Sequence, residues 1–319
     1  MKSSTSDAMP TLFPDSPGRS RPDVAAPEQP DLFVVLDALH DWPVKDDVAS
    51  MEYPIFSLSK TPNTRIRTYS RGGKTLRVIP SAYGAATVFD KDILIYCISQ
   101  LVRAADAGAK VSRRVHIAVH PFLVGTRRST GGAAYERVVD MCRRLKGTTI
   151  ETNIKANERE QTEGFGLIED YRITQYTKNG KGALELELTV SEWLYRAAMD
   201  FDILTLHPDY FSLNQPLERR LYELARKHCG DKAWWICNLP LLHEKTGSSQ
   251  TPRRFKQEIK AVIERNSLPD YKVALDESVK PNQVVFLTRD NPRLFSEAHK
   301  AGKLEWLARI SQKPLAGTR

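Results

Sequence analysis

Four polar side chains recur at helical spacing in the segment 251–266, which reads TPRRFKQEIKAVIERN. Arg253, Gln257 and Lys260 fall on one face of the expected helix, and Arg254 lies beside them. Arginine can pair bidentately with guanine and glutamine with adenine, while lysine neutralises phosphate. The opposite face is apolar and carries Phe255, Ile259, Val262 and Ile263. This segment therefore has the composition of a helix that reads base edges in DNA.

A second candidate helix, at residues 131–147, divides its faces in a similar way. Its inward face is expected to hold Tyr135, Val138, Val139, Cys142 and Leu145. Arg137 and Arg144 are expected to point outward, and Arg127 and Arg128 lead into the helix. We expect Arg254 and Arg144 to contact phosphate, so that losing either would weaken binding to all DNA sequences by the same factor. One basic helix alone is equally well explained as a solvated surface, but two matching ones favour DNA.

The net charge of the chain is unevenly distributed. The whole chain carries +8, yet residues 1–50 hold four Lys/Arg against nine Asp/Glu, so the remainder carries +13. Residues 113–146 hold eight Lys/Arg and only two acids. Such a basic body favours a polyanionic partner. The first 30 residues contain six prolines among Ser, Asp and Ala, a composition that cannot offset its ordering entropy, so we expect a disordered acidic tail.

The bulk composition excludes several other classes of protein. A hydrophobic fraction of 41% and a charged fraction of 27% are typical of a soluble globular protein. Because no apolar run could span a bilayer and no secretion signal is present, we expect a cytoplasmic protein without a membrane partner. No metal-binding or phosphate-loop motif occurs, so we expect no metal, nucleotide or other cofactor. The four cysteines are expected to be buried free thiols: Cys97, Cys142, Cys229 and Cys237.

The elements that would position the two basic helices occur twice along the chain. Each unit reads helix, strand, short helix, helix and β-hairpin, and a shift of about 120 residues lays Tyr135 on Phe255. In the first unit, residues 148–154 are expected to pair with residues 165–177. A pair of helices followed by a hairpin is typical of the winged-helix form of helix-turn-helix.

We therefore expect an α+β fold with two tandem winged helices. The expected divisions are a disordered acidic tail (1–50), an N-terminal winged helix for dimerisation and DNA binding (51–200), a C-terminal DNA-binding winged helix (201–290), and a C-terminal helix and tail (291–319). The C-terminal helix itself is predicted over residues 293–311.

Two long segments resemble a known family. LERRLYELARKHCGDKAWWICNLPLLHEKTGSSQTPRRFKQEIKAVIERN resembles the C-terminal winged helix of plasmid replication initiators. IPSAYGAATVFDKDILIYCISQLVRA is similar to the replication initiator protein A family of Gram-negative broad-host plasmids. The resemblance covers about residues 50–290. It implies binding of double-stranded DNA at direct repeats (iterons) of a plasmid origin, opening of an adjacent AT-rich region, and recruitment of the host's helicase, initiator and polymerase machinery. It also implies that the protein represses its own promoter as a homodimer, through the N-terminal winged helix, and initiates as a monomer.

A short peptide in the tail, QPDLF at residues 29–33, resembles the ligands of the bacterial sliding clamp. In that resemblance Gln29 fills a polar pocket while Leu32 and Phe33 enter an apolar cleft, and the peptide departs from the pattern at Pro30. The alternatives are a chance pentad or the beginning of a strand that continues into VVLDAL. We expect the wild-type protein to capture the β clamp in a pull-down, and the Leu32→Ala/Phe33→Ala variant to lose it.

Two other functions stay open. A rolling-circle initiator would nick DNA with a tyrosine such as Tyr222 and hold a metal with a histidine pair. His116 and His120 are four residues apart rather than two, and Tyr222 lies in an apolar stripe, so we expect no enzymatic activity. A winged-helix transcription regulator is the second alternative, and a footprint on a single palindrome would favour it.

Overall fold

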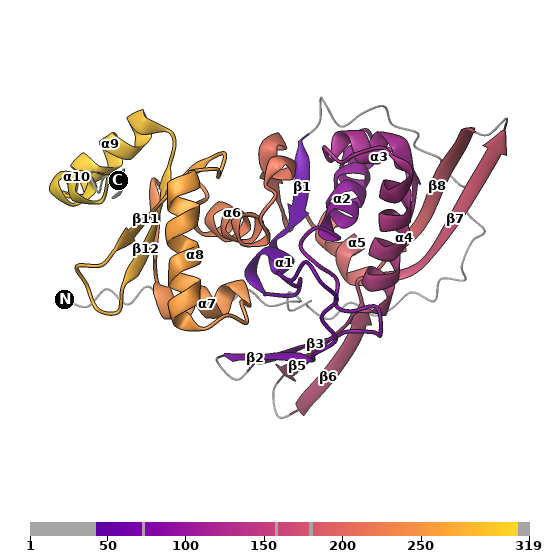
Figure 1. Ribbon diagram of the computed structural model, residues 1–319, viewed down its shortest axis with the longest axis horizontal. Helices are drawn as coiled ribbons and strands as arrows, with labels where there is room; N and C mark the ends of the chain where they lie inside the picture. Colours follow the sequence, from indigo (N-terminus) through magenta and orange to yellow (C-terminus); the bar gives the residue numbers. More distant parts are fainter. Residues whose placement is uncertain (1–42, 72–73, 157–158, 179–180, 312–319) are drawn as a thin grey trace.

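The computed structural model describes residues 43–71, 74–156, 159–178 and 181–311 (Figure 1). Helices and antiparallel strands are mixed along this part of the chain, so the predicted α+β class is confirmed. Every described helix is too short or too polar to cross a bilayer.

The C-terminal unit packs three helices against one face of a three-stranded sheet. Its elements are α6 (Pro216–Cys229), β10 (Trp234–Asn238), α7 (Leu239–Thr246), α8 (Pro252–Arg265), β11 (Tyr271–Asp276) and β12 (Gln283–Thr288). The strands are antiparallel in the order β10-β12-β11. Val284 and Phe286 face the helices, whereas Val285 and Leu287 face the opposite side. The continuous apolar run in β12 is thus that of a strand buried on both faces.

Two further helices, α9 (Asn291–Lys300) and α10 (Leu304–Ser311), cover that opposite side of the sheet. The prediction of one helix over residues 293–311 is wrong, because the chain turns between the two helices. Gly302 there has a φ of 65°, a left-handed conformation that glycine adopts without steric cost. Trp306 of α10 then packs on Trp234 of β10, with 5.6 Å between ring centroids.

The N-terminal unit repeats the arrangement of the C-terminal unit. Its elements are α2 (Lys91–Asp106), β4 (Arg114–Ala118), α3 (Val119–Gly125), α4 (Gly132–Gly147), β7 (Ile168–Lys178) and β8 (Lys181–Val190). The strand order β4-β8-β7 matches β10-β12-β11. β4, α3 and α4 begin at residues 114, 119 and 132, and their counterparts begin at 234, 239 and 252. The repeated order and the shift of 120 residues expected from the sequence are therefore present in the structure.

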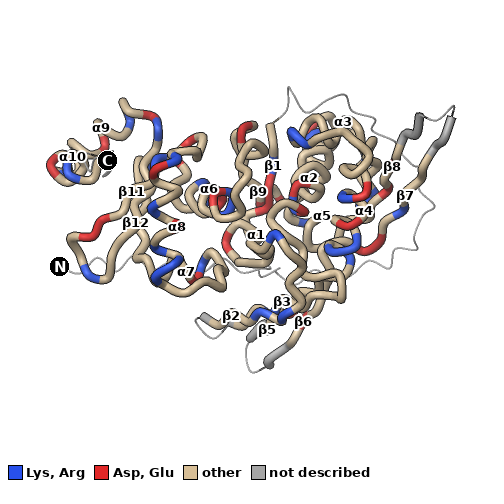
Figure 2. The backbone as a smooth tube through the Cα atoms, in the orientation of Figure 1, with Lys and Arg blue, Asp and Glu red and all other residues tan. Residues whose placement is uncertain are grey.

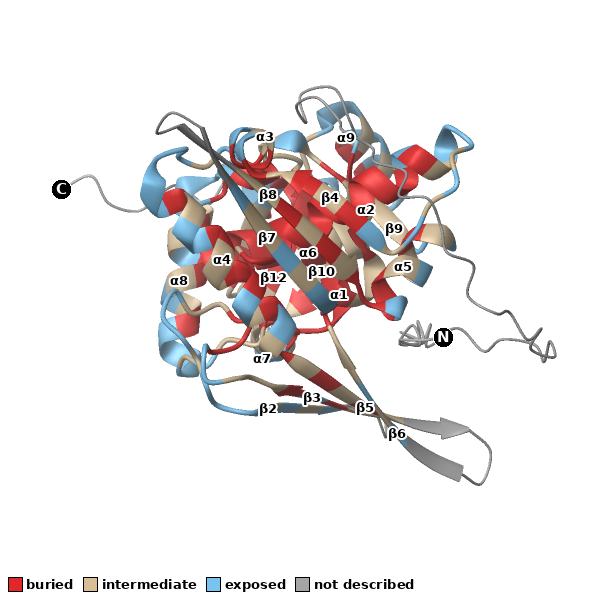
Figure 3. Cartoon of the chain, turned by 90° about the vertical axis from the view of Figure 1, so that its right-hand side faces the viewer, coloured by how far each residue is buried: buried red, intermediate tan, exposed pale blue. Residues whose placement is uncertain are grey.

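The N-terminal unit differs by one inserted hairpin, β5 (Thr149–Ala156) and β6 (Arg159–Gly166). It joins β2 (Arg67–Arg71) and β3 (Lys74–Ile79) in a separate sheet of order β2-β3-β5-β6, which reaches away from the body (Figure 3). The predicted pairing of residues 148–154 with 165–177 is therefore wrong, since β5 pairs with β6 and β7 with β8. β6 is an edge strand and its sequence is mostly polar, so it lacks the apolar alternation that indicates a strand.

A short segment before the N-terminal unit lies between the two units. It contains β1 (Val44–Asp47) and α1 (Val48–Glu52), and later elements beside it are α5 (Glu192–Met199), β9 (Ile203–Leu206) and the 3-10 helix η2 (Pro208–Ser212). β1 pairs with β9, and α1 lies against α6. The predicted tail boundary at residue 50 does not match this arrangement. Asp46 and Asp47, which the sequence analysis assigned to the disordered acidic tail, are buried in the structure.

The hydrophobic cores of the two units meet at this segment. Met51 of α1 and Ile95 of α2 are fully buried in the core of the C-terminal unit, although both lie outside it in sequence. The helices α2 and α6, which open the two units, are thereby held in one body.

Candidate nucleic-acid interface

The helix α8 begins and ends at the residues that its sequence indicates. The Thr251 hydroxyl accepts a hydrogen bond from the Arg254 backbone N–H at 3.4 Å, and Pro252 occupies the first turn, where its missing N–H costs nothing. The helix ends at Asn266, which has a φ of 48°. Phe255, Ile259 and Val262 are buried, so one face of α8 is fixed against the core.

The opposite face of α8 is exposed to solvent, and Figure 2 marks the Lys and Arg positions along this helix in blue. Arg253, Arg254 and Gln257 make no side-chain hydrogen bond or ion pair with the described residues. Lys260 lies 3.2 Å from Glu277, a residue just after β11 that also pairs with Lys256 at 2.9 Å. Hydrogen bonds from Lys256 and Lys260 lower the pKa of Glu277 to about 2. Because Lys256 can hold Glu277 alone, Lys260 can turn toward a ligand without leaving the carboxylate unpaired.

The matching helix α4 presents fewer free cations than its sequence predicts. Arg137 is exposed, and within the described residues its guanidinium donates only to the Ser129 hydroxyl, at 3.1 Å. Arg144 was expected to point outward, but the structure folds it back onto α2. Its guanidinium binds both carboxylate oxygens of the buried Asp90, each at 2.7 Å. This bidentate pair anchors α4 to the start of α2.

Arg127 and Arg128, in the loop before α4, are also held by internal partners. Arg127 pairs with Asp209 of η2 at 2.6 Å. Arg128 donates to Asp92 at 2.6 Å and to the Phe89 carbonyl at 2.7 Å. The structure therefore brings four of the eight predicted contact residues together on α8 and leaves a fifth, Arg137, exposed on α4. The other three, Arg127, Arg128 and Arg144, take part in internal ion pairs.

The residues named for the alternative functions are placed as follows. Tyr222 is fully buried, and its hydroxyl donates to Asp270 at 2.5 Å, so it offers no accessible nucleophile. His116 lies on β4, 3.3 Å from Glu185, whereas His120 belongs to α3, so the two histidines do not share a strand face. In the part of the chain that the structure describes, no three His, Cys, Asp or Glu side chains group as metal ligands. The candidate clamp peptide (Gln29, Leu32 and Phe33) lies outside the described residues, so it stays a prediction.

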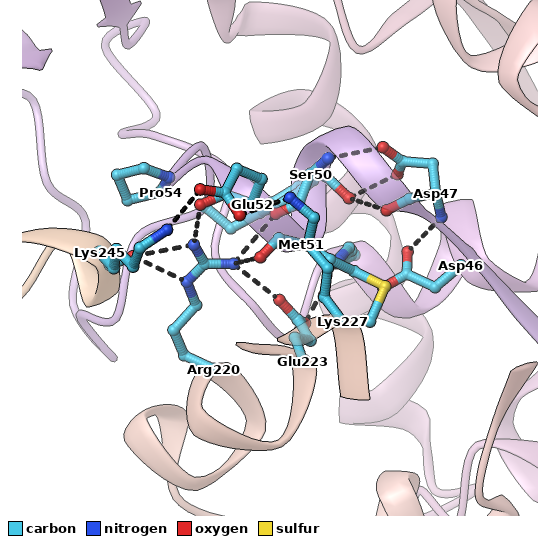
Figure 4. A network of polar contacts seen from close by, with 12 residues as sticks. Asp46, Asp47, Ser50, Met51, Glu52, Pro54, Arg220, Glu223, Lys227 and Lys245 are labelled. Atoms are coloured by element: carbon cyan, nitrogen blue, oxygen red, sulfur yellow. Dashed lines mark hydrogen bonds and ion pairs between the residues drawn. The ribbon is translucent and has the colours of Figure 1, made fainter. Parts of the chain in front are cut away.

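The junction between the two units is a buried network of charges (Figure 4). The Lys91 ammonium of α2 lies 2.6 Å from Asp46 of β1 and 3.2 Å from Glu223 of α6. The next residue, Asp92, pairs with Arg219 of α6. The side chains of all these residues are at most 3% exposed. Since α2 and α6 are the first helices of the two units, these ion pairs join equivalent elements.

Arg220 of α6 is the most fully bonded side chain in the network, and its guanidinium is buried. It satisfies carbonyl oxygens at the end of α1 that have no partner within that helix. Its acceptors are the carbonyls of Ser50, Met51, Glu52 and Lys245, at 2.8 to 3.0 Å, and the Glu223 carboxylate at 3.2 Å.

The Glu52 carboxylate, at the end of α1, contacts three cationic or polar side chains. Lys227 and Lys245 each lie 2.5 Å from its carboxylate, and His228 lies at 3.1 Å. Burial alone would raise the pKa of Glu52, but the His228 hydrogen bond and the two ammonium charges outweigh burial and hold this pKa well below its usual range. Glu52 is thus an ionised anchor between α1, α6 and α7.

Sequence reasoning missed these junction residues, and no local signal reveals them. On α6, Arg219, Arg220, Glu223 and Lys227 form a polar stripe opposite Leu217, Leu221 and Leu224, which is the pattern of an ordinary surface helix. Only their partners at positions 46, 52 and 92 show that this stripe is buried.

The Asp46 carboxyl gives the junction a measurable pH dependence. Burial raises its pKa from 3.8 to about 8, against the opposing effect of the Lys91 charge. Between these two values the folded protein holds a proton that the unfolded chain has released, so a rise in pH favours unfolding. We expect the free energy of unfolding to fall from pH 6.5 to pH 8, a window above the ordinary pKa of histidine, and Asp46→Asn to remove most of this fall.

Urea unfolding at constant ionic strength measures this slope. Asp140→Asn is the matched control, because Asp140 is half exposed and its ion pair in the described part of the chain is with Arg143 on its own helix. An Asp46→Asn variant with the same slope as the wild type would contradict the assignment.

The fold is shared with solved structures of another protein. Crystal structures of domains 2 and 3 of RctB superpose with TM-scores of 0.58 and 0.52, and each is 14% identical in sequence. Both matches cover 76% of this chain, and 98% and 97% of the respective RctB chains. The similarity places this chain in the same fold class as those two RctB domains.

The family follows from the sequence matches. The model of the family described as Replication initiator protein A matches residues 45–273. The chain is also 37% identical over 243 residues to a protein named "Putative replication protein" from Wigglesworthia glossinidia brevipalpis, which covers 76% of this chain and 88% of that protein. The chain belongs to the replication initiator protein A family, as its resemblance predicted, and this membership implies DNA binding.

Proposed function

We propose that this protein initiates plasmid replication by binding iterons at the origin through two winged helices. In this arrangement α8 and α4 lie in successive major grooves, and the hairpins β11–β12 and β7–β8 are the wings that touch the backbone. The observation that carries the proposal is the outer face of α8, where Arg253, Arg254 and Gln257 are exposed without internal partners in the described chain.

The contacts divide by chemistry. Arg253 and Gln257 are the base-reading residues on α8, because their side chains match the edges of guanine and adenine. Lys260 and Arg254 supply charge to the phosphates beside them, and Arg137 does the same from α4. Arg127, Arg128 and Arg144 are left out of this set, since their guanidinium groups already bind carboxylates.

The wing of the C-terminal unit supports this orientation. Lys272 on β11 and Lys280 after it are exposed on the hairpin that Glu277 ties to α8. A wing held against the reading helix in this way would follow it to the adjacent phosphates.

After binding, the protein would promote opening of the AT-rich region and recruit host helicase, initiator and sliding clamp in the cytoplasm. These steps extend the family resemblance, and the clamp contact would be made by Gln29, Leu32 and Phe33. Since the sequence has no phosphate-binding loop, the energy for opening would come from binding and from supercoiling.

DNase footprinting on the DNA that flanks the gene tests the proposal. We expect protection of a series of direct repeats, with affinity that falls as salt rises. Protection of a single palindrome and of no repeat array would instead identify a transcription regulator. Nicking of supercoiled origin DNA that depends on a divalent metal would identify an enzyme.

A further inference from the structure

The ion pairs at the junction connect the two reading helices through one continuous path. We infer that this path fixes the separation and angle of α4 and α8, so that the protein selects DNA by the spacing between its two contacted segments. The inference rests on the proposed function, and it assigns Lys91, Asp92, Arg219 and Glu223 as positioning residues that touch no DNA.

The path starts on the N-terminal unit. Arg144 binds α4 to Asp90, the residue that precedes α2. Lys91 and Asp92, the next two residues, carry the connection across to Glu223 and Arg219 of α6. Of these three consecutive residues, Asp90 therefore binds the reading helix α4, and Lys91 and Asp92 bind α6 of the C-terminal unit.

The path ends on the C-terminal unit with a similar contact. Glu218, in the first turn of α6, pairs with Arg265 at the end of α8 at 2.6 Å. In each unit an arginine from the last turn of the reading helix thus binds an acid at the start of the first helix. The two reading helices are thus connected by ion pairs together with two stretches of backbone, residues 90–92 and the helix α6.

Burial makes the central links between α2 and α6 stiff. Arg219 lies between the rings of Phe89 and Tyr210, at 4.6 and 5.0 Å from their centroids, so its guanidinium has little room to turn. A buried ion that left its partner would lose both the attraction and any contact with water. The side chains therefore have no alternative arrangement of similar energy.

A second contact fixes the entrance to α8. Gly247, between α7 and α8, has a φ of 68°, and a Cβ there would lie 2.6 Å from the Cβ of Pro54. The turn that precedes α8 thus rests directly on the chain between α1 and β2.

A stiff junction has a consequence for the DNA. Each added base pair moves the second contact by about 3.4 Å and turns it by about 35° around the duplex axis. A protein whose reading helices cannot move apart loses contacts on DNA with inserted base pairs. A variant with a weakened junction can adjust the separation of its helices and recover these contacts.

The test uses the full-length protein and the origin site defined by footprinting, with one or two base pairs inserted between the two contacted segments. We expect the wild type to lose about 10-fold or more in affinity with two inserted pairs, a loss of the size of one mismatched contact. Arg219→Met should reduce this loss to below about 3-fold. The matched control is Arg309→Met, because Arg309 pairs with the buried Asp276 inside the C-terminal unit, at 3.0 Å, and this variant should keep the wild-type spacing penalty.

A second measurement needs no DNA. Spin labels on cysteines placed at Ala133 in α4 and Ser267 after α8 report the separation directly, and all four native cysteines are buried. We expect one narrow distance distribution for the wild type, and a broader one for Arg219→Met or, if that variant does not fold, for Glu223→Gln. A broad distribution in the wild type, or equal spacing penalties in the wild type and the folded junction variants, would overturn the inference. A wild type that binds no origin repeat would instead overturn the proposed function, whatever the distances show.

Discussion

Replacing Arg253, Gln257 and Lys260 together by alanine is expected to abolish selective binding to the origin repeats. Each lost base contact costs about 1–3 kcal/mol, so the two base-reading residues alone account for roughly a 30-fold loss or more. The loss of a phosphate contact at Lys260 should also reduce the slope of log affinity against log salt by about one. The fold should persist, because the buried face of α8 is untouched.

A titration at matched salt with the origin repeat and a scrambled repeat measures both effects. The control variant is Arg254→Ala, which should weaken binding to the two DNAs by the same factor, because a phosphate contact carries no sequence information. If the triple variant bound the origin repeat as tightly as the wild type, α8 would not be the reading helix.

Arg220→Met should be the most destabilising single substitution on α6. It removes the donors that satisfy four carbonyl oxygens and leaves Glu223 with one charged partner fewer. Removing one partner of a buried charge pair costs about 3–5 kcal/mol. The carbonyl oxygens left without a hydrogen bond lower the stability further.

Urea unfolding followed by circular dichroism gives this difference. Arg196→Met is the comparison, because Arg196 is 64% exposed and pairs with Glu192 one turn away on α5, where such pairs contribute about 0.3–0.5 kcal/mol. Similar losses in the two variants would show that the Arg220 network contributes little.

The parts of the structure that the sequence predicts are those with short-range signals. Thr251 and Pro252 mark the beginning of α8, and Gly230 with its φ of 50° ends α6. These residues act on backbone groups within four positions of themselves, so a local pattern contains the whole cause. The repeat was visible for the same reason, since each unit is a sequence of such local patterns.

No comparable local sequence pattern predicts which way the charged side chains point. A helical wheel assigns Arg144 to the outside because it is polar, and the acid that draws it inward belongs to another helix, 54 residues away. Arg219 and Asp92 are 127 residues apart. Whether an arginine is free to contact DNA or pairs within its own protein depends on such distant partners. The sequence therefore predicted the exposed face of α8, but it did not predict that Arg144 of α4 pairs internally.

The position of Ile95 determines whether the two units can be separated into independently folded fragments. Its side chain belongs to the opening helix of one unit but fills the core of the other, together with Met51. If the chain were divided between residues 200 and 201, the C-terminal fragment would have a cavity where Met51 and Ile95 pack. The N-terminal fragment would expose these two apolar side chains to solvent. The two repeats are therefore not interchangeable modules. The caps and core contacts of α8 are set by positions other than those on its exposed face. If α8 reads DNA as proposed, that face is where DNA specificity could be changed without disturbing the fold.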